Sequence, residues 1–329
     1  MSARKQSMLE AIEKFPTVRV MVVGDVMLDT FEFCFSKDSK PIDSEKPGKR
    51  AYRSHQTIKV LGGAGNVAAN LASLDVHTIL IGLSGNDEHY FKLRELAEEH
   101  HISLSLIRDA SRPTTIKARI YVDDDYLLRR DDEATHPASD QISTTLVNEV
   151  IRNLSLCDVV ILSDYAKGLF TYDNARKILH ECRMREIPVI VDFKPGNAAF
   201  FSDASIMAPN ESEARKLISD FSLINPAPGL IALRKQLGSD NVIITLGNKG
   251  MCGYDGSTVF HIPGNNVSAV DAVGCGDTVR AVLAIGMALG LSLEEAASLA
   301  NDAAAVIVQK PATASISREE LRQFVEGKY

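Results

Sequence analysis

Four short apolar runs that end in a polar residue or a glycine limit the folds open to this chain. They are rich in β-branched residues and lie at 18–25, 159–164, 189–192 and 242–247. Runs of this length without polar alternation are typical of strands buried on both faces of a parallel sheet. Helical patterns lie between them, so the sequence predicts an α/β fold that binds its ligands at the carboxyl ends of the strands.

Local patterns predict the other elements. An alternating segment at 114–123 predicts an exposed antiparallel strand whose partner is 126–130. No repeat or long linker is present, so we expect one domain over residues 1–329, with a small β sheet from about 30–60 and 113–131. Further strands are expected at 77–84 and 205–208, and helices at 62–70, 87–100 (from an Asp cap), 141–154, 172–186, 277–290, 293–309 and after Ser317.

Composition excludes several classes of protein. A net charge of −7 and a pI near 5.7 argue against a nucleic-acid partner. The sequence has no apolar run long enough to span a membrane and no signal-peptide core, so no membrane partner is expected. The five cysteines are scattered and have no Cys-x-x-Cys pair, which favours reduced thiols and a cytoplasmic location over disulfides or zinc.

A glycine turn at 271–278 precedes an apolar helical stretch. Gly274 and Gly276 have no Cβ, so a ligand can approach the backbone there. The amides of residues 274–277 would point outward at a helix N-terminus, where a phosphate oxygen is favoured. Asp277 on this turn is either a helix cap or a general base aimed at the bound anion.

A second glycine-rich segment fits a dinucleotide fingerprint only formally. Gly63-x-Gly65-x-x-Ala68 has the spacing, and Asp87 follows about 20 residues later. A fingerprint of that kind should follow the first strand directly, and here a long polar segment intervenes. NAD binding is therefore disfavoured.

Four motifs occur in a fixed order at 62–68, 210–213, 245–250 and 271–277. Together they resemble the signatures of the PfkB/ribokinase family of sugar kinases. The resemblance spans nearly the whole chain. It implies a ribokinase-like three-layer α/β domain with a mostly parallel central sheet, a small β-sheet lid, and ATP and Mg²⁺ as cofactors.

Within that family the chain is most similar to the heptose 7-phosphate kinases, the kinase half of bifunctional ADP-heptose synthases. The residues that carry this likeness are 24–29, 113–119, 127–129, 163–168 and 303–310. No nucleotidyltransferase sequence follows Tyr329, so a stand-alone kinase is expected. The chain departs from the family pattern at 44–47, 191–196, Cys275 and 311–314.

The resemblance implies roles for individual residues. Asp277 would be the base, and Gly274, Cys275 and Gly276 would hold the transferring phosphoryl group. Cations for the substrate's own phosphate would be Arg119, Lys167 and Lys194, with solvated surface cations as the alternative. The sugar would contact Asp29, Gly63, Asn66 and Asp192.

The same resemblance places the nucleotide. Asn210 and Glu213 would orient Mg²⁺ through water, although a helix-capping pair is the alternative. Asn301 and Ala304 would face the adenine, although both also fit plain helix positions. The nucleotide phosphates and ribose would contact Thr245, Gly247 and Gly250.

The implied reaction is ATP-dependent phosphorylation of the anomeric hydroxyl of D-glycero-β-D-manno-heptose 7-phosphate to the 1,7-bisphosphate. Another sugar or sugar-phosphate kinase of the same fold is the first alternative. A sugar-binding protein without catalysis is the second, because of the altered 191–196 segment. Open strand edges of the lid often pair between subunits, so a homodimer is a further hypothesis.

Overall fold

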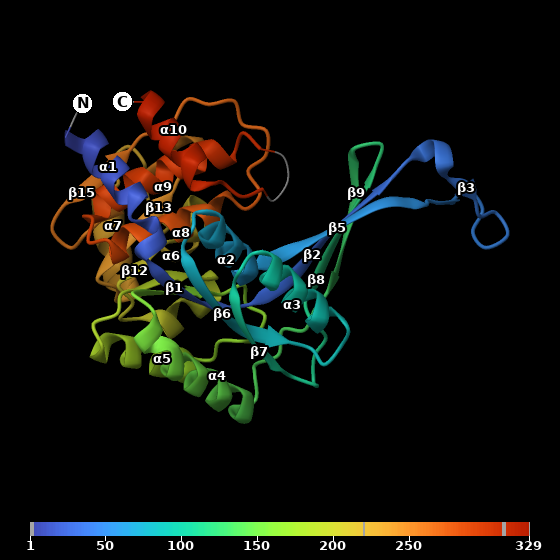
Figure 1. Ribbon diagram of the computed structural model, residues 1–329, viewed down its shortest axis with the longest axis horizontal. Helices are drawn as coiled ribbons and strands as arrows, with labels where there is room; N and C mark the ends of the chain where they lie inside the picture. The colour runs from blue at the N-terminus through green and yellow to red at the C-terminus, as the bar shows by residue number, and fades with distance from the viewer. Residues whose placement is uncertain (1–2, 220, 311–313, 329) are drawn as a thin grey trace.

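A nine-stranded sheet runs through the centre of the computed structural model, in the order β15-β14-β13-β12-β11-β10-β1-β6-β7 (Figure 1). The pairs from β12–β13 through to β6–β7 are parallel, and β14 and β15 continue the sheet antiparallel. The structure describes residues 3–219, 221–310 and 314–328, so only Ala314 of the divergent segment 311–314 is described. The strands are β1 Arg19–Gly24, β6 His77–Ser84, β7 Ser103–Arg108, β10 Val159–Ser163, β11 Val189–Asp192, β12 Ile206–Met207, β13 Asn241–Thr245, β14 Met251–Tyr254 and β15 Val259–Ile262.

Strand alternation divides the interior into two cores. Val20 and Val22 of β1 belong to one cluster, whereas Met21 and Val23 belong to the other. Because successive side chains point to opposite faces of a sheet, an apolar run is buried on both sides only when helices cover both faces. One face is covered by α1 Ala3–Glu13, α2 Ala64–Ser73, α3 His89–Glu99, α8 Cys275–Ala288, α9 Leu293–Ile307 and α10 Arg318–Lys328; the other by α4 Asp140–Asn153, α5 Tyr172–Met184, α6 Glu211–Leu217 and α7 Ala227–Leu237.

A second sheet of four strands projects from the main body as an arm (Figure 1). We call it the small sheet. Its order is β5-β2-β8-β9, and β2 pairs antiparallel with β5 and parallel with β8. Its strands are β2 Val26–Cys34, β5 Ser54–Gly63, β8 Ile116–Val122 and β9 Asp125–Asp132, with a two-stranded extension of β3 Lys40–Pro41 and β4 Arg50–Ala51. The expected three-layer α/β class with a small β sheet is confirmed.

Several local predictions need correction. Asp87 lies one residue before the cap position of α3, Glu88, but its Oδ1 accepts from the amide of His89, the first residue of that helix, at 3.1 Å. The same carboxylate accepts from the amide and hydroxyl of Thr114 at 2.7 and 2.8 Å, which fixes the entry to β8. The strand at 114–123 is antiparallel only to β9 and lies parallel to β2 on its other side. Five elements have sequence patterns too short or mixed to predict them: α1, α7, β7, β14 and β15.

A single residue, Asp25, separates β1 from β2. The central sheet therefore continues directly into the small sheet. Gly24 sits at this junction, where an added Cβ would lie 2.7 Å from Cβ of Ala64 and 2.8 Å from Cβ of Ser163. The junction is too tightly packed to accept a side chain.

We expect Gly24→Ala to destabilise the protein by about 1–3 kcal/mol, because overpacking at this junction forces β1, β10 and α2 apart. Gly327→Ala is the matched control, since nothing lies within 4 Å of a Cβ added there. The control should leave stability unchanged or raise it by up to about 1 kcal/mol. Urea unfolding monitored by circular dichroism measures both, and equal midpoints for the two variants would contradict the packing argument.

Candidate active site

The glycine turn predicted from the sequence opens α8. Gly274 is the residue at which the helix begins, with φ +79°, a left-handed conformation that glycine adopts without strain. The Cys275 amide donates to the carbonyl of Ala272 at 3.3 Å. The Asp277 amide donates to the carbonyl of Gly274 at 3.0 Å. The expectation that amides 274–277 are all free is wrong for these two, because the turn closes on itself.

The side chain of Asp277 is buried and held from two other segments. Its Oδ2 accepts from Nδ2 of Asn66 in α2 at 2.6 Å, and its Oδ1 accepts from the hydroxyl of Tyr165 at 2.8 Å. The carboxylate therefore does not cap α8, whose cap position is Gly274. Burial raises the pKa of Asp277, and Arg280 and the two hydrogen bonds oppose that rise.

Arg280 lies one helical turn after Asp277. Its buried guanidinium pairs with Asp192 at the end of β11, at 2.7 Å. Burial lowers the pKa of Arg280, but Asp192 and Asp277 outweigh it and hold that pKa above its usual range. Burial also raises the pKa of Asp192 to about 6. A Cβ added at Gly276 would collide with Nη1 of Arg280, so the guanidinium lies directly against the glycine turn.

Sequence reasoning gave no role to Arg280. A signal was present, since Arg280 is the one charged residue in the stretch 279–292. A charge in a helix that is apolar on all sides must be buried with a partner. The partner is Asp192, whose Oδ1 accepts from the guanidinium of Arg280 and which was expected to contact the sugar.

Asp29 and Arg119, both expected to contact the substrate, contact each other. Asp29 lies within β2, opposite Lys117 of β8. Nη1 of Arg119 lies 3.2 Å from Oδ1 of Asp29. Burial raises the pKa of Asp29, and Arg119 opposes that rise. Both atoms of this ion pair are buried, and neither has a hydrogen-bond partner within the described part of the chain.

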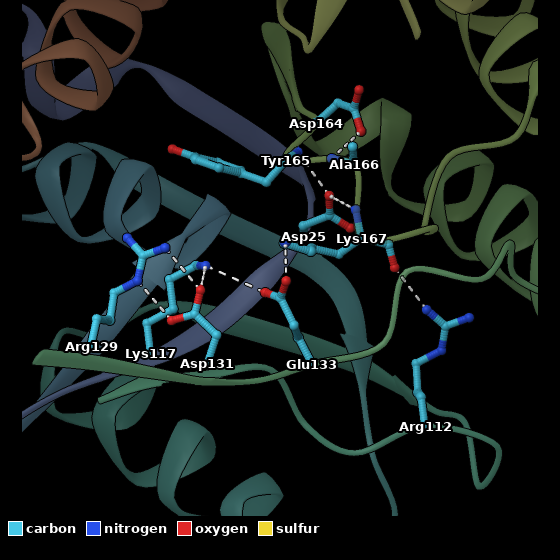
Figure 2. Close-up of polar contacts among 10 residues, drawn as sticks. All are labelled: Asp25, Arg112, Lys117, Arg129, Asp131, Glu133, Asp164, Tyr165, Ala166 and Lys167. Atoms are coloured by element: carbon cyan, nitrogen blue, oxygen red, sulfur yellow. Dashed lines mark hydrogen bonds and ion pairs between the residues drawn. The ribbon is translucent and has the colours of Figure 1, made fainter. Parts of the chain in front are cut away.

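Lys167 is directed toward the small sheet. Its Nζ lies 2.7 Å from Oε1 of Glu133, which follows β9, and Lys117 of β8 lies 3.4 Å from the other oxygen (Figure 2). Lys117 also pairs with Asp131 at 3.2 Å, and Asp131 with Arg129 at 2.7 Å. This chain of charges joins the small sheet to the turn after β10.

Two buried aspartates fix that turn (Figure 2). Oδ2 of Asp25 accepts from the amides of Tyr165 at 2.8 Å and Lys167 at 3.1 Å. Oδ1 of Asp164 accepts from the amide of Ala166 at 2.9 Å. Ala166 has φ +56°, a conformation that needs such support in a residue other than glycine.

Lys194, Asn210 and Glu213 form one polar group. Nζ of Lys194 lies 2.9 Å from Oε1 of Glu213. The Asn210 side chain accepts from the Glu213 amide at 2.9 Å, and Oε2 of Glu213 accepts from the Asn210 amide at 3.0 Å. These reciprocal bonds form a capping box at the start of α6, the alternative considered for this pair.

A cavity of about 610 Å³ opens beside the glycine turn. Its lining includes Cys275, Gly276 and Arg280 from α8. Asn210 also lines it, so the capping box lies at its wall. The six residues expected to contact the nucleotide come from three separate segments, and all of them line this cavity: Asn210, Thr245, Gly247, Gly250, Asn301 and Ala304.

Gly63, with φ +58°, is the last residue of β5 in the small sheet and the cap residue that precedes α2. An added Cβ would collide with the carbonyl of Asp25. The segment that formally fits a dinucleotide fingerprint therefore follows β5 of the small sheet and not the first strand of the central sheet. The acidic residue of that fingerprint, Asp87, is hydrogen-bonded to Thr114. This position does not suit a dinucleotide-binding turn.

Comparison with known proteins gives the family. Residues 18–320 match the model of the pfkB family carbohydrate kinases. The chain belongs to this family. It is a carbohydrate kinase with a ribokinase-like fold.

Curated relatives are about one-third identical to the chain. It is 36% identical to the bifunctional protein HldE of Bradyrhizobium diazoefficiens over 316 residues, which are 93% of this chain and 62% of the relative. It is also 36% identical to HldE of Nitrobacter hamburgensis, over 94% of this chain and 64% of the relative. The match thus spans less than two thirds of the length of these relatives.

Solved structures share the fold at low identity. Phosphofructokinase-2 from Escherichia coli, in a complex with potassium, has a TM-score of 0.76 at 16% identity, over 94% of this chain and 99% of that one. Ribokinase from Thermotoga maritima has a TM-score of 0.70 at 24% identity, with the same coverage of both chains. At these identities the neighbours support the fold alone.

Two kinds of feature were not found among the described residues. None of the helices that the structure describes has the length and apolar character needed to cross a membrane. Over 3–219, 221–310 and 314–328, no three His, Cys, Asp or Glu side chains lie together in a way that could hold a metal ion.

The raised pKa of Asp25 predicts how the stability of the protein depends on pH. Burial, followed by the nearby charge of Asp164, raises that pKa from 3.8 to about 6. Between pH 7 and pH 4 the folded state therefore takes up a proton before the unfolded state does, and the free energy of unfolding rises as the pH falls. Relative to Asp25→Asn, the wild type should gain about 2 kcal/mol over that range, because the unfolded carboxyl is itself partly protonated at pH 4. Chemical unfolding at several pH values measures the difference, which should stay constant if Asp25 is not perturbed.

Proposed function

We propose that this chain transfers the γ-phosphoryl group of ATP to the anomeric hydroxyl of D-glycero-β-D-manno-heptose 7-phosphate, giving the 1,7-bisphosphate. The observation that carries the proposal is the position of Asp277. Its carboxylate is buried between α2 and the turn after β10, while the glycine turn beside it lines the 610 Å³ cavity. The names of the HldE relatives favour a heptose substrate.

In the proposed reaction Asp277 accepts the proton of the sugar hydroxyl as that oxygen attacks the γ-phosphorus of ATP. ATP would lie in the cavity, with its phosphates at the glycine turn of α8. Phosphoryl transfer depends on positioning and on charge placed where negative charge develops. The helix N-terminus and the buried guanidinium of Arg280 supply positive charge at that point.

Asn210 at the cavity wall and Glu213, its partner in the capping box, fit Mg²⁺ bound through water. Asn210 and Glu213 offer amide and carboxylate oxygens, which this ion prefers, and it keeps much of its hydration shell. Direct coordination by Glu213 would break its bonds to Lys194 and to the Asn210 amide. When bound with ATP, Mg²⁺ neutralises charge on the phosphates.

The sugar end of the site is proposed on the small-sheet side. Asp29 and Arg119 bring buried polar atoms that have no hydrogen-bond partner in the described residues, as expected where a ligand hydroxyl or phosphate completes the set. Lys167 and Lys194 each pair with a glutamate, so a substrate phosphate would compete with Glu133 or Glu213. Gly63 and Asn66 lie at the start of α2, beside Asp277.

The test is ADP release with MgATP against heptose 7-phosphate, sedoheptulose 7-phosphate, fructose 6-phosphate and ribose. We expect turnover with heptose 7-phosphate alone. Asp277→Asn keeps the shape of the side chain and should lose at least about 10²-fold in kcat, as for a missing general base. Asp158→Asn is the control, because Asp158 precedes β10 at the opposite end of that strand and pairs with Arg19.

The outcomes separate the alternatives. Turnover with a different sugar would retain the kinase and replace the substrate. Binding of a sugar without turnover would favour the non-catalytic alternative. The single-domain organisation over 1–329, the stand-alone kinase and the cytoplasmic location remain predictions.

We also propose a homodimer through the small sheet. Strand β9 is an edge strand, and all of its residues are exposed, among them Tyr126, Leu127 and Leu128. An exposed apolar edge of this kind readily pairs with a second copy. Sedimentation velocity should show a dimer that Leu127→Lys weakens, and a monomeric wild type at micromolar concentration would contradict the proposal.

A further inference from the structure

Tyr165 holds the proposed base but belongs to none of the roles assigned above. Its hydroxyl donates to Oδ1 of Asp277 at 2.8 Å, while Asn66 donates to Oδ2 at 2.6 Å. Each oxygen of the carboxylate therefore has its own donor, from a different element. Two donors on two oxygens fix the rotation of a carboxylate group, and each oxygen keeps a lone pair for another partner.

The side chain of Tyr165 is itself held in place by other residues. Asp25 and Asp164, both buried, bind the backbone of the turn that carries Tyr165 (Figure 2). The ammonium group of Lys194 lies 5.4 Å from the ring centroid. A ring fixed at both its backbone and its face is suited to positioning a hydrogen bond.

We infer that Tyr165 is a positioning residue for Asp277: its hydroxyl orients the carboxylate and favours the charged form over the protonated one within the buried site. The inference rests on the proposed function of Asp277 as the base. A hydrogen bond donated to a carboxylate favours the charged form, which is the form that accepts a proton. It acts together with Asn66 from α2, so the base is aligned by two elements other than its own helix.

Other charges also act on Asp277 and must be considered in any pH dependence. Arg280 lies on the same helix, and Asp192 follows from β11. Lys194 lies after β11, and Asp29 faces the site from β2 of the small sheet. The change made at Tyr165 leaves all four in place, so a shift in the pH profile reports the lost hydrogen bond.

The experiment compares Tyr165→Phe with the wild type in kcat and KM from pH 5 to pH 9. We expect kcat to fall about 10-fold or more, as for the loss of a hydrogen bond to a charged group. The KM for ATP should change little, and the acidic limb of kcat/KM should move to higher pH. In an Asp277→Asn background the same change should have no further effect, because the two residues act as a unit.

Tyr254→Phe is the matched control. Its hydroxyl also makes one hydrogen bond, to the carbonyl of Gly256 at 2.8 Å, and it lies in β14. The control should keep the wild-type kcat and pH profile. A partly unfolded Tyr165→Phe preparation would lose activity equally at all pH values, so the shift of the acidic limb separates positioning from folding.

Two results would overturn the inference, and they differ. A Tyr165→Phe protein with wild-type kcat and pH profile, beside an inactive Asp277→Asn protein, would remove the role of Tyr165 and leave the proposed function standing. A wild type that transfers no phosphoryl group to any sugar would remove the proposed function and this inference with it.

Discussion

The buried pair of Arg280 and Asp192 is the interaction on which the site depends. It joins α8 to the end of β11 and places a full positive charge directly against the glycine turn. A buried charge is tolerated only with a partner, so each residue requires the other. Asp277, one turn earlier on the same helix, lies in the field of that guanidinium. The same pair therefore fixes the helix to the sheet and moderates the effect of burial on the carboxylate.

The fold was predictable because the strongest patterns are local. The apolar runs at 189–192 and 77–84 became β11 and β6 with the expected bounds, since a strand buried on both faces leaves a clear signal. Strands β14 and β15 were missed because Gly253 and His261 interrupt their short apolar runs, whereas β11 has an unbroken run before its Asp192. The contact of Asp87 with the start of α3 was predictable, but its second partner, Thr114, was not, because Thr114 is distant in sequence and close only in the folded chain.

The sequence predicted which residues gather at the candidate site, but not which of them contact one another. The motifs bring Asn210, Thr245 and Asn301 to one cavity, as expected for a shared ligand. They could not show that Arg119 faces Asp29, or that Lys167 faces Glu133, because those pairs depend on how the small sheet meets the main body. Each cation expected to bind phosphate already has an acidic neighbour, which no spacing in the sequence reveals.

Asp25 belongs both to the junction between the two sheets and to the contacts that hold the turn after β10. It is the whole connection between β1 and β2, and its carboxylate also anchors the turn that carries Tyr165 and Lys167. Asp25 therefore links the junction of the two sheets to the turn whose Tyr165 hydroxyl donates to Asp277, although the small sheet and the cavity share no strand.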